Sequence, residues 1–261
     1  MAFRLLFIGD VVGEAGCAAV RSLVPALRRE LELDVVGANG ENSAPGGRGV
    51  MAKSGSALLS VVDFLTLGNH AFDAEKEYVD REPRVIRPAN LGGDLPGRGW
   101  GTFEVGGVRV GVANVQGRVF MREVPRSPFE AGDEAVAALE AFGTDLILVD
   151  VHAEATSEKQ AMGYHLAGRA QAVIGTHIHV PTADARILPG GTAYVSDVGM
   201  TGSADGIIGF DKEDFLDLFL GRRPWRIGVS KGPSRLSAAV VEVEVESRRA
   251  IGIEGVYRES T

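Results

Sequence analysis

The chain has 261 residues, of which 45% are hydrophobic and 24% are charged. This composition is typical of globular proteins, and the length allows a well-filled core. The formal net charge of −8 argues against a broad basic surface for duplex nucleic acid, although a small anionic substrate is still compatible because bound cations can dominate the local field.

The apolar run at residues 3–8 reads as a buried strand that opens the chain. It is short, stops at Asp10 and lacks the cleavage pattern of a signal peptide. No apolar stretch approaches the ~20 residues of a membrane span. The single cysteine, Cys17, excludes an intrachain disulfide and suits a reducing compartment. We therefore expect a cytoplasmic protein with no membrane contact.

Strand and helix patterns alternate over the first 81 residues. After the first strand, the order is a helix at 15–31, a strand at 34–38, a helix at 50–61, a strand at 63–67 and a polar helix at 73–81. Alternation of this kind is typical of an α/β fold.

The rest of the chain adds hairpins to this alternation. Gly106-Gly107 separates strand-like runs at 101–105 and 108–115, which is a turn signal between two strands. There follow a helix (129–142), a strand (145–151), a helix (157–166), a strand (172–175), a second hairpin (186–188 with 192–196), a helix (211–220) and a final strand pair (236–245 and 250–257). With no repeat and no long linker, the pattern predicts one domain over residues 1–261, built of mixed sheets with helices outside.

Polar residues of metal-binding type follow the predicted strands. In open α/β sheets, sites form beyond the carboxyl ends of the strands, so these loops could converge on one point. The residues in chain order are Asp10, then Asn39, Glu41 and Asn42, then Asn69 and His70, then Asp150 and His152, and finally His177 and His179.

The histidines sharpen this pattern. Four of the five lie at strand ends, and only His165 sits in a helical pattern, where it reads as a surface or packing residue. Imidazole nitrogens suit zinc, manganese, iron or cobalt, and carboxylate oxygens suit harder cations. Three histidines, an Asp, a Glu and two Asn carbonyls can hold two metal ions, with Glu41 as the bridge. Such a pair activates a water and stabilises an in-line phosphoryl displacement.

Each of these residues also has a structural interpretation. Asp10 could cap a helix, and the Asn residues could form turns. His177 and His179 would point to the same face if the strand continued, but they could equally be core residues with satisfied hydrogen bonds. Glu41 does little for a turn, so the combination favours a metal centre. No Walker loop, dinucleotide fingerprint or nucleophilic serine elbow occurs in the sequence.

The order of motifs resembles the calcineurin-like metallophosphoesterase superfamily. It departs from the commonest pattern at Val12, where a His is usual, at Gly40-Glu41-Asn42, and at Ala71, where an acid is frequent. These departures resemble one bacterial branch, the YmdB-like phosphodiesterases. The segments that carry this likeness are Phe7–Gly13, Ala38–Asn42, His152–Gln160 and Asp197–Gly202, and the likeness extends over almost the whole chain.

The resemblance implies a four-layer α/β/β/α sandwich of two mixed sheets and a metal-dependent phosphodiesterase. It implies one metal ion on Asp10, Glu41, Asn42 and His179, and a second on Glu41, Asn69, His152 and His177. It also implies His70 as general acid, with a metal-bridging hydroxide attacking small diesters such as 2',3'-cyclic nucleotides. Iron or manganese is expected first, and zinc, cobalt or magnesium is compatible with the same ligands. A homo-oligomer is expected from the resemblance alone.

Three further residues are candidates for substrate contact, namely Arg48, Arg118 and Thr201, each of which could equally be structural. The substrate is expected to be a small phosphate ester, most simply a nucleotide. Rival functions are a phosphomonoesterase or nucleotidase on the same site, an amide-type metallohydrolase, and a regulatory protein that binds metal without turnover. The His-x-His pair usually comes first in amide hydrolases and comes last here, which disfavours that rival.

Overall fold

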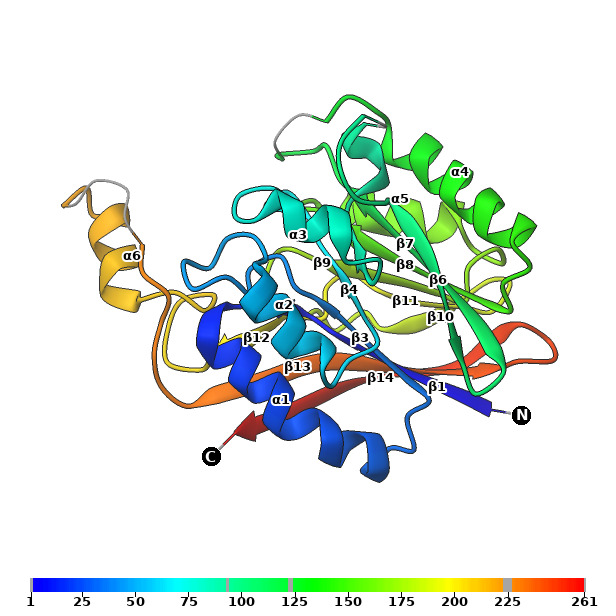
Figure 1. Cartoon of the computed structure of the whole chain (residues 1–261), viewed down its shortest axis with the longest axis horizontal. Coiled ribbons are helices and arrows are strands. Elements are labelled where there is room, and N and C mark those ends of the chain that lie inside the picture. Colours follow the sequence, from blue (N-terminus) through cyan, green and yellow to red (C-terminus); the bar gives the residue numbers. More distant parts are fainter. Residues whose placement is uncertain (1, 93, 122–123, 223–226, 261) are drawn as a thin grey trace.

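The computed structural model describes residues 2–92, 94–121, 124–222 and 227–260, and its strands form two mixed sheets (Figure 1). The strands of the first sheet are β1 (Ala2–Ile8), β2 (Asp10–Val11), β3 (Val35–Asn39), β4 (Phe64–Thr66), β5 (Val85–Ile86), β12 (Met200–Ser203), β13 (Ser234–Glu244) and β14 (Arg249–Ser260). Their order is β2-β12-β13-β1-β3-β4-β5, with β14 paired to β13. Strands β1, β3, β4 and β5 are parallel, whereas β13 runs antiparallel to β1.

The second sheet is parallel in its centre and antiparallel at both edges. Its strands are β6 (Trp100–Val105), β7 (Val108–Gln116), β8 (Leu146–His152), β9 (Ala172–Thr176), β10 (Arg186–Leu188) and β11 (Thr192–Val195). The order is β10-β11-β9-β8-β7-β6. Both predicted glycine hairpins are confirmed, since β6 pairs antiparallel with β7 and β10 pairs antiparallel with β11.

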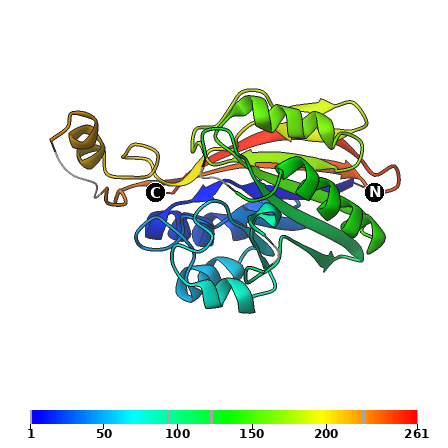
Figure 2. The same ribbon diagram turned by 90° about the horizontal axis from the view of Figure 1, so that it is seen from above.

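Helices cover the outer faces of the two sheets (Figure 2). The helices of the chain are α1 (Gly13–Glu30), α2 (Ala52–Leu59), α3 (Lys76–Arg81), α4 (Pro128–Ala141) and α5 (Thr156–His165), with a short 3-10 helix, η1 (Ala89–Leu91), and α6 (Lys212–Phe219), which lies away from the sheets. Pro128 begins α4, where a missing N–H costs no hydrogen bond. Asp211 caps α6, because its side chain accepts from the backbone N–H groups of Glu213 and Asp214.

The core divides into three clusters that follow the stacking of these elements. One lies between the first sheet and α1 and α2, and includes Val20 and Leu58. A second lies between the two sheets, where Phe7 and Phe64 stack at 6.4 Å. A third lies between the second sheet and α4 and α5, and includes Leu139. Alternate residues of β1 enter the first two clusters, which explains why this strand is apolar on both faces.

Helix α6 differs from the other helices because none of its residues is buried. It stands on an arm that projects from the body of the protein (Figures 1 and 2). Within the described ranges, no helix has both the length and the apolar character needed to cross a membrane.

The elements that were not predicted from the sequence are short strands and the 3-10 helix η1. Strands β2, β5 and β12 were not predicted, because two to four residues are too few to show a periodicity. Strand β12 lies in the segment around Thr201 and pairs with β2, so that Met200 faces Asp10. Asp10 therefore lies in a strand and does not cap α1, whose N-cap residue is Val12.

Candidate metal centre

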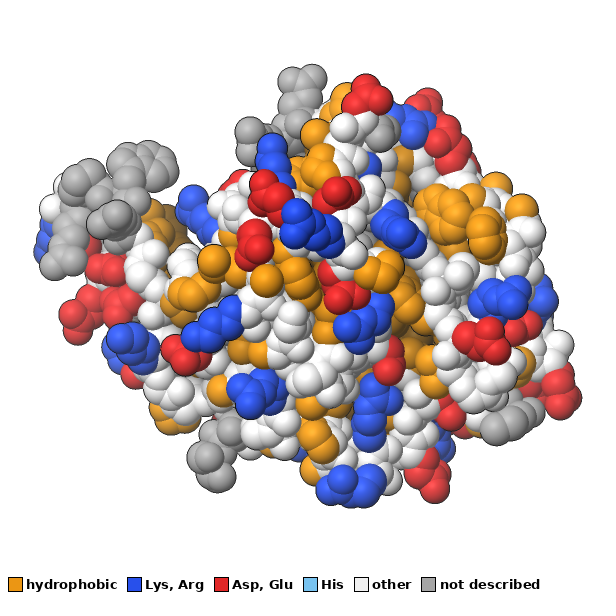
Figure 3. Space-filling model, in the orientation of Figure 1, with side chains coloured by type: hydrophobic (Ala, Val, Ile, Leu, Met, Phe, Trp, Pro, Cys, Tyr) orange, Lys and Arg blue, Asp and Glu red, His pale blue; other side chains and the backbone are white. Residues whose placement is uncertain are grey.

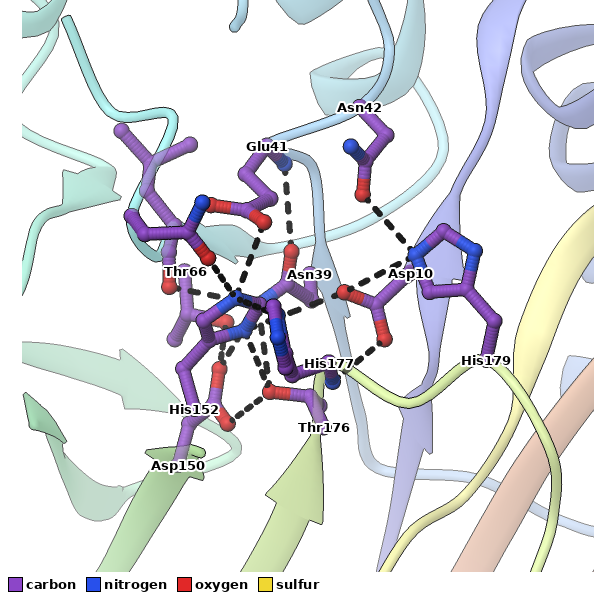
Figure 4. A network of polar contacts seen from close by, with 12 residues as sticks. Asp10, Asn39, Glu41, Asn42, Thr66, Asp150, His152, Thr176, His177 and His179 are labelled. Atoms are coloured by element: carbon purple, nitrogen blue, oxygen red, sulfur yellow. Dashed lines mark hydrogen bonds and ion pairs between the residues drawn. The ribbon is translucent and has the colours of Figure 1, made fainter. Parts of the chain in front are cut away.

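Loops at the ends of both sheets bring the seven predicted ligand residues into one network, six of which are labelled in Figure 4, while Asn69 joins it through His152. Five of them are buried and two, Asn69 and His177, are half-buried. The seven residues are Asp10, Glu41, Asn42, Asn69, His152, His177 and His179. They come from the ends of β1–β2, β3, β4, β8 and β9, so the carboxyl ends of parallel strands form the site, as expected for such sheets.

One half of the network surrounds a single ring nitrogen. His152 Nε2 lies 2.9 Å from Glu41 Oε1, 3.1 Å from Asn69 Oδ1 and 3.0 Å from His177 Nδ1. A ring nitrogen carries at most one hydrogen, so it cannot serve three acceptors fully. Glu41, His152 and His177 also offer ligand atoms that all lie within 4.8 Å of one another. These nitrogen and oxygen atoms are of the types that bind a metal cation.

The orientation of His152 is set by buried residues behind it. The Thr176 hydroxyl donates to Asp150 Oδ1 at 2.7 Å, so it accepts from His152 Nδ1–H at 2.9 Å. Asp150 also accepts from the Thr66 hydroxyl at 2.5 Å and from Asn39 Nδ2 at 3.0 Å. The ring nitrogen of His152 that remains available to a ligand is therefore Nε2, which faces Glu41.

The other half of the network brings acceptor atoms together without a donor. His179 Nδ1–H donates to the carbonyl of Ile208 at 2.8 Å, and Asn42 Nδ2 donates to the carbonyl of Gly47 at 2.8 Å. Consequently the lone pair of His179 Nε2 faces Asn42 Oδ1 at 3.3 Å and Asp10 Oδ1 at 3.9 Å. Asp10 Oδ1 is buried and has no hydrogen-bond partner among the described residues. A cation would satisfy all three atoms, so this set fits one too.

The charges in the network depend strongly on one another. Burial raises the pKa of the Glu41 carboxyl, but the charge of His152 and hydrogen bonds from His152 and His70 outweigh it and lower the pKa to about 2. Burial lowers the pKa of His152, but the carboxylates of Glu41, Asp10 and Asp150 raise it to about 9. Burial and the neighbouring His152 lower the pKa of His177 to about 3. Without a metal, the cluster therefore holds a proton on His152 and keeps His177 neutral.

His70 lies beside the network with one ring nitrogen engaged. Its Nδ1 is 2.7 Å from Asp73 Oδ2, and its backbone N–H donates to Glu41 Oε2 at 2.9 Å. The carboxylate fixes the hydrogen on Nδ1, which leaves Nε2 for exchange with a ligand. The ring is 24% exposed and lines the cavity described below, so a bound molecule could reach it.

Three residues that sequence reasoning did not single out support the histidines. Glu154 Oε2 lies 3.2 Å from His177 Nε2. Lys159 and Asp197 form a fully buried ion pair of 2.7 Å, and Asp197 also accepts from the backbone N–H of Ile178. The sequence held a signal for two of them. Lys159 and Asp197 lie in the segments His152–Gln160 and Asp197–Gly202, which resemble the family.

The His177–His179 segment is not a continuation of the strand. β9 ends at Thr176, and His177 and His179 have φ values of 101° and 63°. These left-handed conformations are uncommon outside glycine. The two rings therefore reach the network through a loop that Asp197 holds in place, and not through alternation along a strand.

A cavity of about 870 Å³ opens over the network, and one of the three candidate substrate contacts lines it. Arg48 is exposed and lines it. Arg118 does not line it, and its backbone N–H donates to the Glu158 carboxylate. Thr201 is fully buried, and its hydroxyl donates to the carbonyl of Ser237 and accepts from the Ser237 N–H. Only Arg48 is therefore placed to meet a ligand in this cavity.

Comparison with known proteins adds the family. A family model described as YmdB-like protein matches residues 6–256. The chain is 43% identical over 256 residues to a 2',3'-cyclic-nucleotide 2'-phosphodiesterase of Bacillus subtilis (strain 168), which covers 97% of this chain and 96% of that protein. The crystal structure of a hypothetical protein from Thermus thermophilus is similar with a TM-score of 0.91 and 43% identity, covering 99% of this chain and 100% of that one. A novel phosphatase from Mycoplasma pneumoniae is similar with a TM-score of 0.89 and 31% identity, covering 99% and 94%. The chain therefore belongs to the YmdB-like protein family.

Proposed function

We propose that this protein is a phosphodiesterase that hydrolyses small phosphodiesters, with 2',3'-cyclic nucleotides as the substrate class, at a centre of two metal ions. The observation that carries the proposal is that hydrogen-bond acceptors lie together with no hydrogen-bond donor between them. The clearest case is Asp10 Oδ1, which lies near His179 Nε2 and Asn42 Oδ1. The name of the Bacillus subtilis relative supports the reaction. Two cations, when bound by these residues, would supply an activated water and would neutralise charge on the phosphoryl oxygens.

The ligand sets follow from the two halves of the network. Asp10, Asn42 and His179 would hold one ion, and Asn69, His152 and His177 the other, with the buried carboxylate of Glu41 between them. Manganese or iron suits this mixture of nitrogen and oxygen ligands. The packing of α1 and α2, the two sheets, and α4 and α5 supports a four-layer α/β/β/α sandwich, formed by one domain over residues 1–261.

The chain's own residues would handle the substrate as follows. Arg48 at the rim attracts the anionic diester, and His70, held by Asp73, donates a proton from Nε2 to the leaving alkoxide. The Thr176 hydroxyl, the Ile208 carbonyl and the Glu154 carboxylate would keep His152, His179 and His177 in one tautomer each, so that the lone pairs stay aimed at the cations.

The proposal is tested by turnover of 2',3'-cyclic AMP, bis-p-nitrophenyl phosphate and p-nitrophenyl phosphate by the manganese-loaded protein, with Asp10→Ala as the blank. Turnover of the diesters that is lost in Asp10→Ala is the expected result. Turnover of the monoester alone would replace the proposal with a phosphomonoesterase. If metal binds and none of the three is hydrolysed, a regulatory metal-binding role replaces it.

Metal binding is expected to release a proton from His152. The pKa of this ring is raised to about 9, and the proton sits on the nitrogen that faces the ligand cluster, so a cation must displace it. The apparent affinity for Mn²⁺ should therefore rise about tenfold for each pH unit between neutrality and pH 9, where it levels off. Calorimetric titration of the chelator-treated protein in two buffers of different ionisation enthalpy counts the protons. A binding heat that does not depend on the buffer would contradict this expectation.

Replacing Glu154 by alanine is expected to weaken Mn²⁺ binding by about 10- to 100-fold, because outer-shell partners of ligand histidines have effects of this size. Glu154 accepts from His177 Nε2–H, which keeps the lone pair on Nδ1 toward the cluster. Glu154→Gln still offers an acceptor oxygen and should keep most of the affinity. Glu77→Ala removes an exposed charge on α3 and is the control for net charge. Equal affinities in all four proteins, measured by calorimetry, would refute the role of Glu154.

A further inference from the structure

The cavity above the metal centre has two unlike sides. One side carries four of the proposed ligand residues with His70 and Arg48, the four being Glu41, Asn42, His177 and His179. The other side carries four apolar residues before, within and after α6, namely Ile208, Phe210, Phe215 and Ile227, together with the carboxylate of Asp214, which accepts from the Gly228 N–H. The metal chemistry described above requires none of these four side chains.

The aromatic residues of the apolar side begin at the metal centre itself. The rings of Phe210 and His179 are nearly parallel, at 8°, with centroids 6.4 Å apart. Phe215 follows at 6.1 Å from Phe210, and Phe219 at 5.9 Å from Phe215. Phe210 and Phe215 are half-buried, whereas Phe219 is 76% exposed and does not line the cavity. A ligand that reaches His179 therefore meets Phe210 and Phe215 next.

The position of Phe210 is built into the site. A Cβ on Gly47 would lie 2.6 Å from the Phe210 ring, so only glycine lets the two come this close. Gly47 has φ +72° and supplies the carbonyl that orients Asn42. The same loop thus fixes one ligand residue and one face of the apolar wall.

The apolar residues on and around α6 are not fully covered by the described residues of the rest of the protein. No residue of α6 is buried, and Ile208 is 38% exposed. Acidic side chains gather on the arm at the left edge of Figure 3, as expected for a helix whose charged residues are Glu213, Asp214 and Asp217 among others. An apolar wall beside a charged centre matches a ligand with one anionic end and one flat, uncharged end.

We propose that Phe210 and Phe215, flanked by Ile208 and Ile227, bind the base of the nucleotide whose phosphodiester lies at the metal centre. This inference rests on the proposed function and adds the part of the substrate that the metal ligands cannot recognise. Bases stack on aromatic rings whatever their sequence identity, because every base has a π face. The site is therefore expected to accept all four bases and to prefer purines, which offer the larger face.

The test compares a cyclic nucleotide with a base-free diester that has the same five-membered cyclic phosphate. kcat/KM is measured for 2',3'-cyclic AMP and for glycerol 1,2-cyclic phosphate with the wild-type protein, Phe215→Leu and Phe219→Leu. Phe215 is chosen because Phe210 also packs on His179 and Gly47. Phe215→Leu should lower kcat/KM for the nucleotide by about tenfold more than for the base-free diester, chiefly through KM. Phe219→Leu removes a ring from the same helix outside the cavity and is the control.

The outcomes separate the subsite from the reaction. An equal loss for both diesters, or no loss for either, overturns the subsite while the phosphodiesterase stands. An equal loss together with a change of molecular mass in light scattering would show that the apolar residues form a contact between copies of the chain. That result also overturns the subsite. If the wild-type protein hydrolyses neither diester, the reaction is refuted. Saturation-transfer NMR of the base protons of 3'-AMP then decides the subsite, which is supported if Phe215→Leu removes the signal and rejected if it does not.

Discussion

Glu41→Gln is expected to reduce diester turnover by roughly 10³-fold or more, the largest loss of any conservative change in the site. Glu41 is the buried carboxylate proposed above as the shared ligand, with Oε1 at 2.9 Å from His152 Nε2 and Oε2 accepting from the His70 N–H. The amide keeps the size of the side chain but removes its negative charge and one of its two acceptor oxygens. The substitution should therefore also lower the metal content.

The measurement is metal content by elemental analysis together with kcat for 2',3'-cyclic AMP. Glu134→Gln is the matched control, because Glu134 is an exposed carboxylate on α4 whose partner is Arg126. It should leave both quantities unchanged. If Glu41→Gln retained two equivalents of metal and near-normal turnover, Glu41 could not be a shared ligand, and the ligand sets proposed above would have to be revised.

His70→Ala is expected to lower kcat for 2',3'-cyclic AMP by about 10²- to 10⁴-fold, the range for loss of a general acid. The alkoxide that leaves from a ribose needs a proton, whereas a nitrophenolate leaves without one. The loss for bis-p-nitrophenyl phosphate should therefore be much smaller than for the cyclic nucleotide. Metal content should be retained, since the His70 ring is bound to Asp73 and its hydrogen bond to Glu41 comes from the backbone N–H, which alanine keeps.

His165→Ala is a close control for this experiment. His165 pairs with Asp133 at 2.9 Å, much as His70 pairs with Asp73 at 2.7 Å, but it lies on α5 and does not line the cavity. Its replacement should change neither substrate's kcat. Full turnover of both diesters by His70→Ala with metals bound would remove the general acid from the mechanism.

The elements and the convergence of the site could largely be predicted from local patterns. Period-two and helical periodicities indicated the longer strands and helices, and two glycine pairs indicated the hairpins. Metal-binding side chains after successive strands predicted a shared site, because parallel strands present their carboxyl ends together. The short strands β2 and β12 could not be predicted in this way, although their pairing positions Asp10.

The supporting residues could not be found by the same reasoning. Asn39 and Asp150 are 111 positions apart in the sequence, and Asn42 and His179 are 137 apart. Asn39 was grouped with the metal-binding side chains, with a turn role as the alternative, yet its side-chain amide N–H donates to Asp150 and its side-chain oxygen accepts from the Glu41 N–H. Thr201 was a candidate substrate contact that could equally be structural, and its hydroxyl is used inside the first sheet. Such roles depend on which distant side chain supplies the partner.

The sequence by itself determined the family, the α/β alternation and the set of ligand-type residues at the strand ends, because these depend on residue type and on periodicities within one segment. Only the tertiary structure decided which nitrogen of each histidine faces the cluster, since the tautomer is set by Thr176, Ile208 and Glu154. It also decided that the arm around α6 brings an aromatic wall to the centre. Hydrogen bonds and ring contacts between distant segments form only when the sheets have packed, so no local pattern encodes them.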